Sequence, residues 1–451
     1  MYRHSASPSR IGRRSLLAGT ATATAAALIG SSASEATATP AAGVRFFTAE
    51  DLNFQTQLLL GVCGYGSAEA GEVLAAVDRI NAAGAGYQRF VEEFRALAAR
   101  TAEQAAARQR AGHIASARGG FLRAASYGSA ALMFVLGTAT PGAEKAVFAE
   151  MRRCWERAAA LFDPPIERVA IDYQGTTMPG YLLRSDRSTR PRPTVILNNG
   201  SDAQSVELYA FGAAAALERG YHALIFEGPG QAAMLFERNV PLRPDWEKVV
   251  TPVVDWLHRR PEVDRDRIAL VGWSLCGESV ARAAAFEHRL AAVCMDPGIV
   301  DVWSIWEPKI GEVFAAGSTR DEVNTVWREQ VVPGLSAVDR FTLAKRAELF
   351  GPGFRADALA GRPPMDVWGL RETLRKFQNA DVAARVRCPA LVTDYENDQL
   401  VSGQSKPLYD LLTCPKDLVT FTTADGAGDH DAVQAPQHRN EVLFDWLDDV
   451  M

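Results

Sequence analysis

The spacing of hydrophobic and polar residues differs between regions of the chain. In residues 48–162, apolar residues recur every three or four positions among Ala, Glu and Arg, as in "YQRFVEEFRALAARTAEQAAARQR". This spacing predicts a segment of three to five helices, with breaks near 84–86, 119–120 and Pro141. The pattern of apolar residues changes at Pro164. After it, "ERVAIDYQGTTMPGYLLRS" predicts two strands around a turn at Gly175.

From Pro193 onward, short apolar runs alternate with amphipathic helices. The runs are "TVILNNG", "HALIFEG", "RIALVGW", "LAAVCMD", "ALVTDYE" and "LVTFTTA". Nearly continuous apolar strands separated by helices indicate an α/β protein whose mostly parallel sheet is covered by helices on both faces. Residues 299–385 interrupt this alternation, because they hold no clear strand and are rich in aromatic residues.

These patterns of apolar residues predict how the chain is organised. We expect an N-terminal helical segment over 45–163 and an α/β core formed by 164–298 and 386–451. A helical cap insertion, 299–385, separates the two parts of the core.

The first 38 residues have the features of an export signal. A basic start with Arg13 and Arg14 precedes a mildly apolar stretch, and small residues surround Ala36 and Ala38. This pattern predicts a twin-arginine-type signal over 1–38 and therefore an exported, extracytoplasmic protein. The apolar stretch is too short and too rich in Ala and Thr to form a stable membrane span. The alternative is a disordered basic tail.

Composition narrows the choice of function. The 451 residues carry a net charge of -6 without a basic stripe, which argues against a nucleic-acid partner. The six cysteines are scattered and have no zinc-type spacing, so a structural zinc site is not expected.

The stretch "ALVGWSLCGESV" carries the main candidate for chemistry. Ser274 lies where an apolar strand ends and a helix begins, the construction of a nucleophile elbow. The helix N-terminus would direct N–H groups toward the reacting oxygen. The alternative is an ordinary strand–helix turn with serine as N-cap. Cys276 occupies the usual position of a glycine, and we expect it to fill a packing space while Gly277 permits the close approach.

A serine nucleophile needs a histidine base, and His430 is the main candidate. It lies in a glycine-rich loop after the last predicted strand, whereas His438 and His288 have the character of surface residues.

The acid that orients this base is expected after the preceding strand. Asp398 is favoured over Asp394 and Glu396 because it lies beyond the carboxyl end of the strand. Asp296 offers a second acid position, and its alternative role is to cap the following turn.

An oxyanion hole requires two backbone N–H donors. Leu275, directly after the nucleophile, is expected to supply one of them. The second is expected from the loop 199–202, where Gly200 and Ser201 are candidates beside Asn199 and Asp202. The sequence leaves the choice among these four open.

Several stretches together resemble a known family. "FEGPGQ" at 226–231, "RPDWEKVVTPVVDWLHRRPEVDRDRIALVGWSL" at 243–275 and "RAAAFEHRLAAVCMDPGIVD" at 282–301 resemble one branch of the α/β-hydrolases. That branch contains dihydroxypseudooxynicotine hydrolase, fungal polyketide-shortening hydrolases and related esterase or dipeptidyl-aminopeptidase-like proteins. The resemblance covers roughly residues 100–450.

The resemblance implies an α/β-hydrolase fold with an N-terminal lid and a catalytic triad of Ser274, Asp398 and His430. Several relatives cleave carbon–carbon bonds beside a ketone, some with an extra acidic group in the cap, which makes Glu307 a candidate. Relatives often dimerise, so a homodimer is one option. The sequence departs from the family where the elbow usually reads S-x-G-G, and its insertion before the acid is longer.

Together these features predict a serine hydrolase that acts through an acyl-enzyme on a hydrophobic or aromatic small-molecule carbonyl substrate. Hydrolysis by a serine nucleophile needs neither a metal nor an organic cofactor, so none is expected. Ester hydrolysis and cleavage of an aryl or polyketide-like ketone are expected ahead of amide cleavage. Trp303 and Trp306 are candidates for substrate binding in a largely apolar, aromatic pocket. The alternatives are an acyltransferase or cyclase on the same fold and, with the least support, a non-catalytic exported binding protein.

Overall fold

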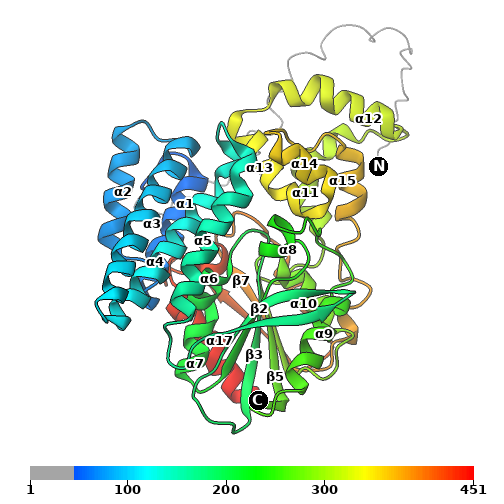
Figure 1. Cartoon of the computed structure of the whole chain (residues 1–451). Coiled ribbons are helices and arrows are strands. Elements are labelled where there is room, and N and C mark those ends of the chain that lie inside the picture. Colours follow the sequence, from blue (N-terminus) through cyan, green and yellow to red (C-terminus); the bar gives the residue numbers. More distant parts are fainter. Residues whose placement is uncertain (1–44) are drawn as a thin grey trace, which may run out of the picture.

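The computed structural model describes residues 45–451, so the expected export signal over 1–38 lies outside the described residues (Figure 1). The first part of the described chain is helical and carries five α-helices. They are α1 (Glu50–Gly61), α2 (Ala70–Ala82), α3 (Tyr87–Arg110), α4 (Ile114–Met133) and α5 (Glu144–Ala159). In the described residues, no helix is both long and apolar enough to cross a bilayer.

One predicted helix break is wrong. Residues 119–120 lie inside α4, and the chain turns earlier, at Gly112 with φ +83°. Gly120 instead marks the contact between two helices, because a Cβ atom there would lie 2.8 Å from the Cβ atom of Ala105 on α3. The glycine therefore permits close helix packing rather than ending a helix.

The predicted sheet is confirmed, with eight strands in the order β1-β2-β4-β3-β5-β6-β7-β8. β1 and β2 form a hairpin whose turn contains Gln174 and Gly175, both at positive φ. β2 also pairs antiparallel with β4, and all later pairs are parallel. The strands are β1 (Glu167–Tyr173), β2 (Thr176–Leu183), β3 (Arg192–Asn198), β4 (His222–Phe226), β5 (Val263–Trp273), β6 (Ala292–Asp296), β7 (Ala390–Tyr395) and β8 (Lys416–Phe421).

Helices between the strands pack against the sheet, and the strands from β3 to β7 are nearly continuously buried. The core helices are α6 (Ser205–Leu208), α7 (Ala214–Glu218), α8 (Ala232–Phe236), α9 (Glu247–His258), α10 (Cys276–Ala284), α16 (Ser405–Leu411) and α17 (Pro436–Val450). The helix expected after β3 is interrupted, because Gly212 takes a non-helical conformation between α6 and α7 and packs against Leu197 of β3.

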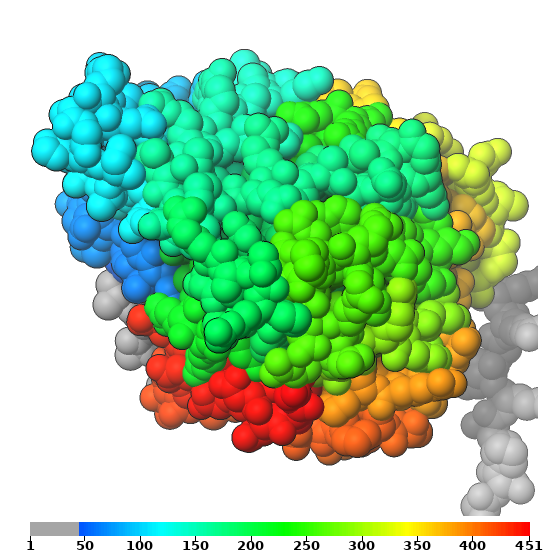
Figure 2. All heavy atoms as spheres, turned by 60° about the horizontal axis from the view of Figure 1, so that its bottom comes forward, coloured from blue at the N-terminus to red at the C-terminus, as the bar shows by residue number. Residues whose placement is uncertain are grey.

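The stretch between β6 and β7 forms a helical cap (Figure 1). Its helices are α11 (Val302–Ile310), α12 (Arg320–Val326), α13 (Ala337–Ala347), α14 (Pro352–Leu359) and α15 (Val367–Leu374). In Figure 1 the cap lies above one end of the sheet, beside the N-terminal helices. Figure 2 shows another face, with the N-terminal helices (blue to cyan) at one side of the core and the C-terminal residues (red) along its edge.

Aromatic packing and a buried group of ion pairs join the cap to the N-terminal helices. Phe341 of α13 packs against Tyr87 of α3 with ring centroids 4.4 Å apart. Close by, Lys345 and Arg355 from the cap form buried ion pairs with Glu144 of α5, and Glu348 of the cap completes the group. These contacts hold the two helical regions together over the same end of the sheet.

Candidate active site

Ser274 lies at the bend between β5 and α10. Its φ is +51°, a left-handed conformation that is uncommon for serine and is typical of a nucleophile elbow. The backbone N–H of Ser274 donates a hydrogen bond of 2.6 Å to the carbonyl oxygen of Asp296 at the end of β6. This bond fixes the bend against the neighbouring strand.

Glycines on both sides of Ser274 make the bend sterically feasible. A Cβ atom at Gly272 would lie 2.4 Å from the carbonyl oxygen of Cys276, and one at Gly277 would lie 1.8 Å from that of Pro297. Gly277 thus provides the close approach expected of it. The elbow keeps its geometry although Cys276 stands where the family usually has a glycine.

His430 follows β8 in the glycine-rich loop and is 2% exposed. Its Nε2 lies 2.8 Å from Ser274 Oγ, and its Nδ1 lies 2.9 Å from Asp398 Oδ2. Asp398 is held in turn by its second oxygen, Oδ1, which accepts 2.8 Å hydrogen bonds from the N–H groups of Leu400 and Val401. Serine, imidazole and carboxylate therefore form one continuous chain of hydrogen bonds.

The competing candidates for base and acid lie elsewhere. Asp296 is buried and accepts hydrogen bonds from the hydroxyl groups of Thr393 and Tyr395. Glu396 accepts a 2.7 Å hydrogen bond from the N–H of Thr423. His438 is on α17 with a side chain that is 43% exposed. The geometry thus selects Asp398 and His430 from the alternatives that the sequence left open.

Cys276 points away from the catalytic cavity. It is 1% exposed, and its sulfur accepts a 3.3 Å hydrogen bond from Gln231 Nε2. Gln231 Nε2 also donates to the carbonyl oxygen of Asn199 at 2.5 Å. Burial raises the pKa of the Cys276 thiol, which disfavours a thiolate. The side chain therefore packs between the elbow and the loop after β3.

The loop 199–202 lies directly against the elbow. A Cβ atom at Gly200 would be 2.8 Å from Ser274 Cβ, so only a glycine fits this approach. Across the described residues, the backbone N–H groups of Leu275, Gly200 and Ser201 have no intramolecular acceptor. These free donors surround Ser274, as an oxyanion hole requires.

An arginine from the cap holds this loop. Arg346 of α13 donates a 3.0 Å hydrogen bond to Ser201 Oγ and forms an ion pair with Asp202. Arg346 was missed by sequence reasoning, because it belongs to no local motif and reaches the loop only through the folded cap.

A second carboxylate also lies near His430. Asp431 Oδ1 is 3.5 Å from His430 Nε2, is buried, and has no hydrogen-bond partner among the described residues. Burial alone would lower the pKa of His430, but the charges of Asp431 and Asp398 outweigh it and raise this pKa to about 9. Burial also raises the pKa of Asp431. The adjacent "HD" in the sequence could have drawn attention to Asp431.

Two cavities meet at Ser274. The larger has a volume of about 940 Å³ and lies between α1, α13 and the triad. The smaller, of about 70 Å³, extends under the cap and is lined by Leu275, Trp306 and Phe350, among others. Ser201 lines the small cavity and Gly200 the large one. Ser274 is therefore accessible from both cavities.

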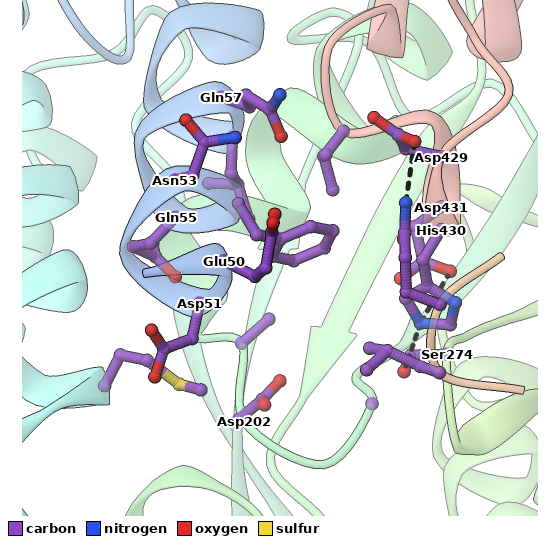
Figure 3. A pocket seen from close by; sticks show the side chains of 18 of the residues that line it. Glu50, Asp51, Asn53, Gln55, Gln57, Asp202, Ser274, Asp429, His430 and Asp431 are labelled. Atoms are coloured by element: carbon purple, nitrogen blue, oxygen red, sulfur yellow. Dashed lines mark hydrogen bonds and ion pairs between the residues drawn. The ribbon is translucent and has the colours of Figure 1, made fainter. Parts of the chain in front are cut away.

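Helix α1 lies across the large cavity from Ser274 and His430 (Figure 3). It contributes polar and acidic residues to the lining, which are Glu50, Asp51, Asn53, Gln55 and Gln57, together with the apolar Phe54 and Leu58. The ring centroid of Phe54 lies 6.5 Å from that of His430. The expected apolar, aromatic lining is found in the small cavity and also in the large one, where Phe54, Phe211 and Phe341 contribute, while α1 adds polar groups to the large cavity.

The predicted cap residues have different positions. Trp306 lines the small cavity beside Ser274. Trp303 and Glu307 line neither cavity; Trp303 packs against Phe314, and Glu307 is exposed. The prediction that Trp303 and Glu307 contact substrate is therefore wrong, because Trp303 packs within the cap and Glu307 is exposed. Lys309, on the same helix, lines both cavities and was missed by sequence reasoning.

Comparison with known proteins identifies the family of this chain. Residues 84–309 match the family described as Esterase FrsA-like. The chain is 30% identical over 383 residues to the α/β hydrolase ucsC of Acremonium sp, covering 79% of this chain and 77% of that relative. It is 28% identical over 420 residues to the 20-hydroxy-prefusarin hydrolase FUS2 of Gibberella moniliformis, covering 90% and 97% of the two chains.

Among solved structures, 2,6-dihydroxy-pseudo-oxynicotine hydrolase has the same fold, with a TM-score of 0.65 and 21% sequence identity. The match covers 88% of this chain and 95% of that one. The resemblance inferred from the sequence motifs is therefore confirmed. This chain belongs to the FrsA-like esterase family of α/β-hydrolases and is an enzyme of the hydrolase class.

Proposed function

We propose that this hydrolase cleaves a small-molecule carbonyl compound through an acyl-enzyme formed on Ser274. The observation that carries the proposal is the unbroken hydrogen-bond chain from Ser274 Oγ through His430 to Asp398, with bonds of 2.8 and 2.9 Å. In its neutral form, His430 would remove the serine proton through Nε2 while Nδ1–H donates to Asp398.

The remaining steps follow from the groups around Ser274. Attack on the carbonyl carbon places negative charge on its oxygen, which the N–H groups of Leu275 and the loop 199–202 would stabilise. His430 would then return the proton to the leaving group, an alkoxide from an ester or a carbanion from a ketone. Water, activated by His430, would release the acyl group as a free acid.

Ester hydrolysis and carbon–carbon cleavage beside a ketone both fit this sequence of steps. Two similar proteins are named as hydrolases of 20-hydroxy-prefusarin and of 2,6-dihydroxy-pseudo-oxynicotine, which supports a hydrophobic or aromatic carbonyl substrate here. Transfer of the acyl group to an acceptor other than water would use the same nucleophile, and product analysis separates the two: a free acid supports hydrolysis. The twin-arginine-type signal and export remain a proposal that depends on residues 1–38 alone.

A fluorophosphonate probe tests the nucleophile. The wild-type protein should be labelled at Ser274, labelling should vanish in Ser274→Ala, and it should be strongly slowed in His430→Ala. Circular dichroism checks that both variants are folded. Folded wild-type protein that resists labelling would contradict the proposed function.

A further inference from the structure

Five residues line both cavities that adjoin the nucleophile: Ser274, Lys309, Thr342, Arg346 and Leu400. They mark the junction through which a substrate would pass from the large cavity into the small one. Two of the five, Lys309 and Arg346, are cations, and both come from the cap. A reacting carbonyl at Ser274 would therefore lie beside positive charge.

Most cations around these cavities already have a carboxylate partner. Arg45 pairs with Glu50, Lys345 with Glu144 and Glu348, and Arg346 with Asp202. Lys309 differs from them. Within residues 45–451, no carboxylate oxygen lies within 4.0 Å of its ammonium group.

Lys309 is an exposed residue at the rim of both cavities, where it lies beside Arg346 without a carboxylate partner in the described residues. Desolvation at the cavity wall lowers the pKa of its ammonium group, and the nearby charge of Arg346 adds to the effect. The guanidinium group of Arg346 already donates hydrogen bonds to Ser201 and Asp202. An anion bound at the junction would reduce the repulsion between the two cations, and Lys309 is the cation there that has no carboxylate partner within residues 45–451 and can bind it.

The two cavities restrict where that anion sits in a substrate. The small cavity, of about 70 Å³, accepts only a small group, and its wall is largely apolar, formed by Leu275, Val302, Ile305, Trp306, Leu343 and Phe350. The large cavity, of about 940 Å³, holds the bulk of the molecule. A negative oxygen at Lys309 therefore belongs to neither end of the substrate, but to atoms near the carbonyl that Ser274 attacks.

We propose that Lys309 binds an anionic oxygen located within a few bonds of the scissile carbonyl, so that the substrate is an anionic carbonyl compound. The oxygen belongs to a carboxylate or to the enolate of a 1,3-dicarbonyl group. This inference rests on the proposed function, because it takes Ser274 as the reacting group. It assigns Lys309 to substrate recognition, a role that the sequence had given to the outward-facing Glu307 on the same helix.

Protection of Ser274 from fluorophosphonate tests the inference without a known substrate. One arm compares 4-oxo-4-phenylbutanoate with its neutral amide. The second compares 1-phenyl-1,3-butanedione with its 2,2-dimethyl analogue, which has no hydrogen on C2 and so cannot form the enolate of the 1,3-dicarbonyl group. The anionic member of at least one pair should protect the wild-type protein at a concentration about tenfold lower than its neutral partner, equivalent to about 1.4 kcal/mol.

Variants of Lys309 then locate the effect. Lys309→Met should remove the preference for the anionic compound and leave protection by the neutral compound within about twofold of wild type. Lys309→Arg should retain most of the preference for the anionic compound. Lys376→Met is the matched control, because Lys376 is exposed and lines neither cavity. It should behave as wild type.

The possible failures are distinguishable. Absence of labelling in folded wild-type protein contradicts the proposed function. Labelled wild-type protein without anion preference in either arm, or an equal shift for anionic and neutral compounds in Lys309→Met, overturns the assignment of Lys309 alone. The arm that shows the preference identifies carboxylate or enolate as the source of the charge.

Discussion

The two walls of the large cavity differ in how their side chains are held. The triad wall is built on loops at the ends of β5, β7 and β8, and backbone hydrogen bonds fix Ser274 and Asp398 directly. The opposite wall comes from α1 and α13, which belong to the N-terminal helices and the cap. The candidate triad thus lies at the carboxyl ends of strands, whereas the opposite wall comes from helices, of which α13 also holds the loop 199–202 through Arg346.

The largest expected effect comes from replacing the acid of the candidate triad, Asp398. Asp398→Asn should lower kcat by about 10³- to 10⁴-fold, because a neutral amide neither stabilises the imidazolium nor holds His430 in the required tautomer. The measurement is hydrolysis of a reporter ester under saturating conditions.

Glu396→Gln provides the control for Asp398→Asn. Glu396 lies two residues earlier on the same loop but contacts Thr423 rather than His430. It should retain at least about half of the activity, since exposed changes away from the site have small effects. Equal loss in both variants would mean that the loop, rather than the acid, matters.

The same contrast explains what could be predicted from sequence. The strands, the elbow and the order of Ser274, Asp398 and His430 leave local signals, because each stands beside a buried apolar run and a turn. Arg346 and Lys309 leave no such signal. Their roles depend on how the cap folds over the sheet, which is a long-range property. Aromatic residues of the cap were misleading for a related reason, since packing within the cap and contact with substrate favour the same residue types.

The contact between the two helical regions predicts a large effect on stability. Lys345→Met should lower the free energy of unfolding by about 3–5 kcal/mol, because it leaves the buried Glu144 and Glu348 with less compensating charge. Chemical denaturation measures the change. Lys406→Met is the matched control; its exposed pair with Asp410 on α16 should contribute less than about 0.5 kcal/mol. Similar losses in both variants would refute the proposed importance of the buried network.

A smaller and pH-dependent effect is expected from Asp431. Because its charge helps to raise the pKa of His430 to about 9, the neutral base should be depleted below that pH, and kcat/KM should fall as the pH decreases. Asp431→Asn removes this charge and should shift the acidic limb of the profile to lower pH. Each unit of decrease in pKa raises the neutral fraction near pH 7 about tenfold.

Asp429→Asn separates the charge next to His430 from the general acidity of the cavity. Asp429 also lines the large cavity, but its carboxylate accepts hydrogen bonds from the amides of Asn397, Gln399 and Gln434. Its replacement should leave the acidic limb nearly unchanged. A profile that moves equally in both variants would show that the limb reports the net charge of the cavity.

The smallest effect is expected at Cys276, and it tests how far the triad wall tolerates change. Cys276→Gly removes a buried side chain and an acceptor for Gln231, which also bonds to the loop 199–202 through Asn199. We expect stability to fall by about 1–2 kcal/mol, with kcat/KM reduced less than tenfold, because Gly277 already provides the close approach that the elbow needs. Cys276→Ser, which keeps an acceptor, should lie between the glycine variant and wild type. If Cys276→Gly were folded yet as inactive as Ser274→Ala, the link through Gln231 to the oxyanion loop would be essential to catalysis, and the tolerance inferred for this wall would be wrong.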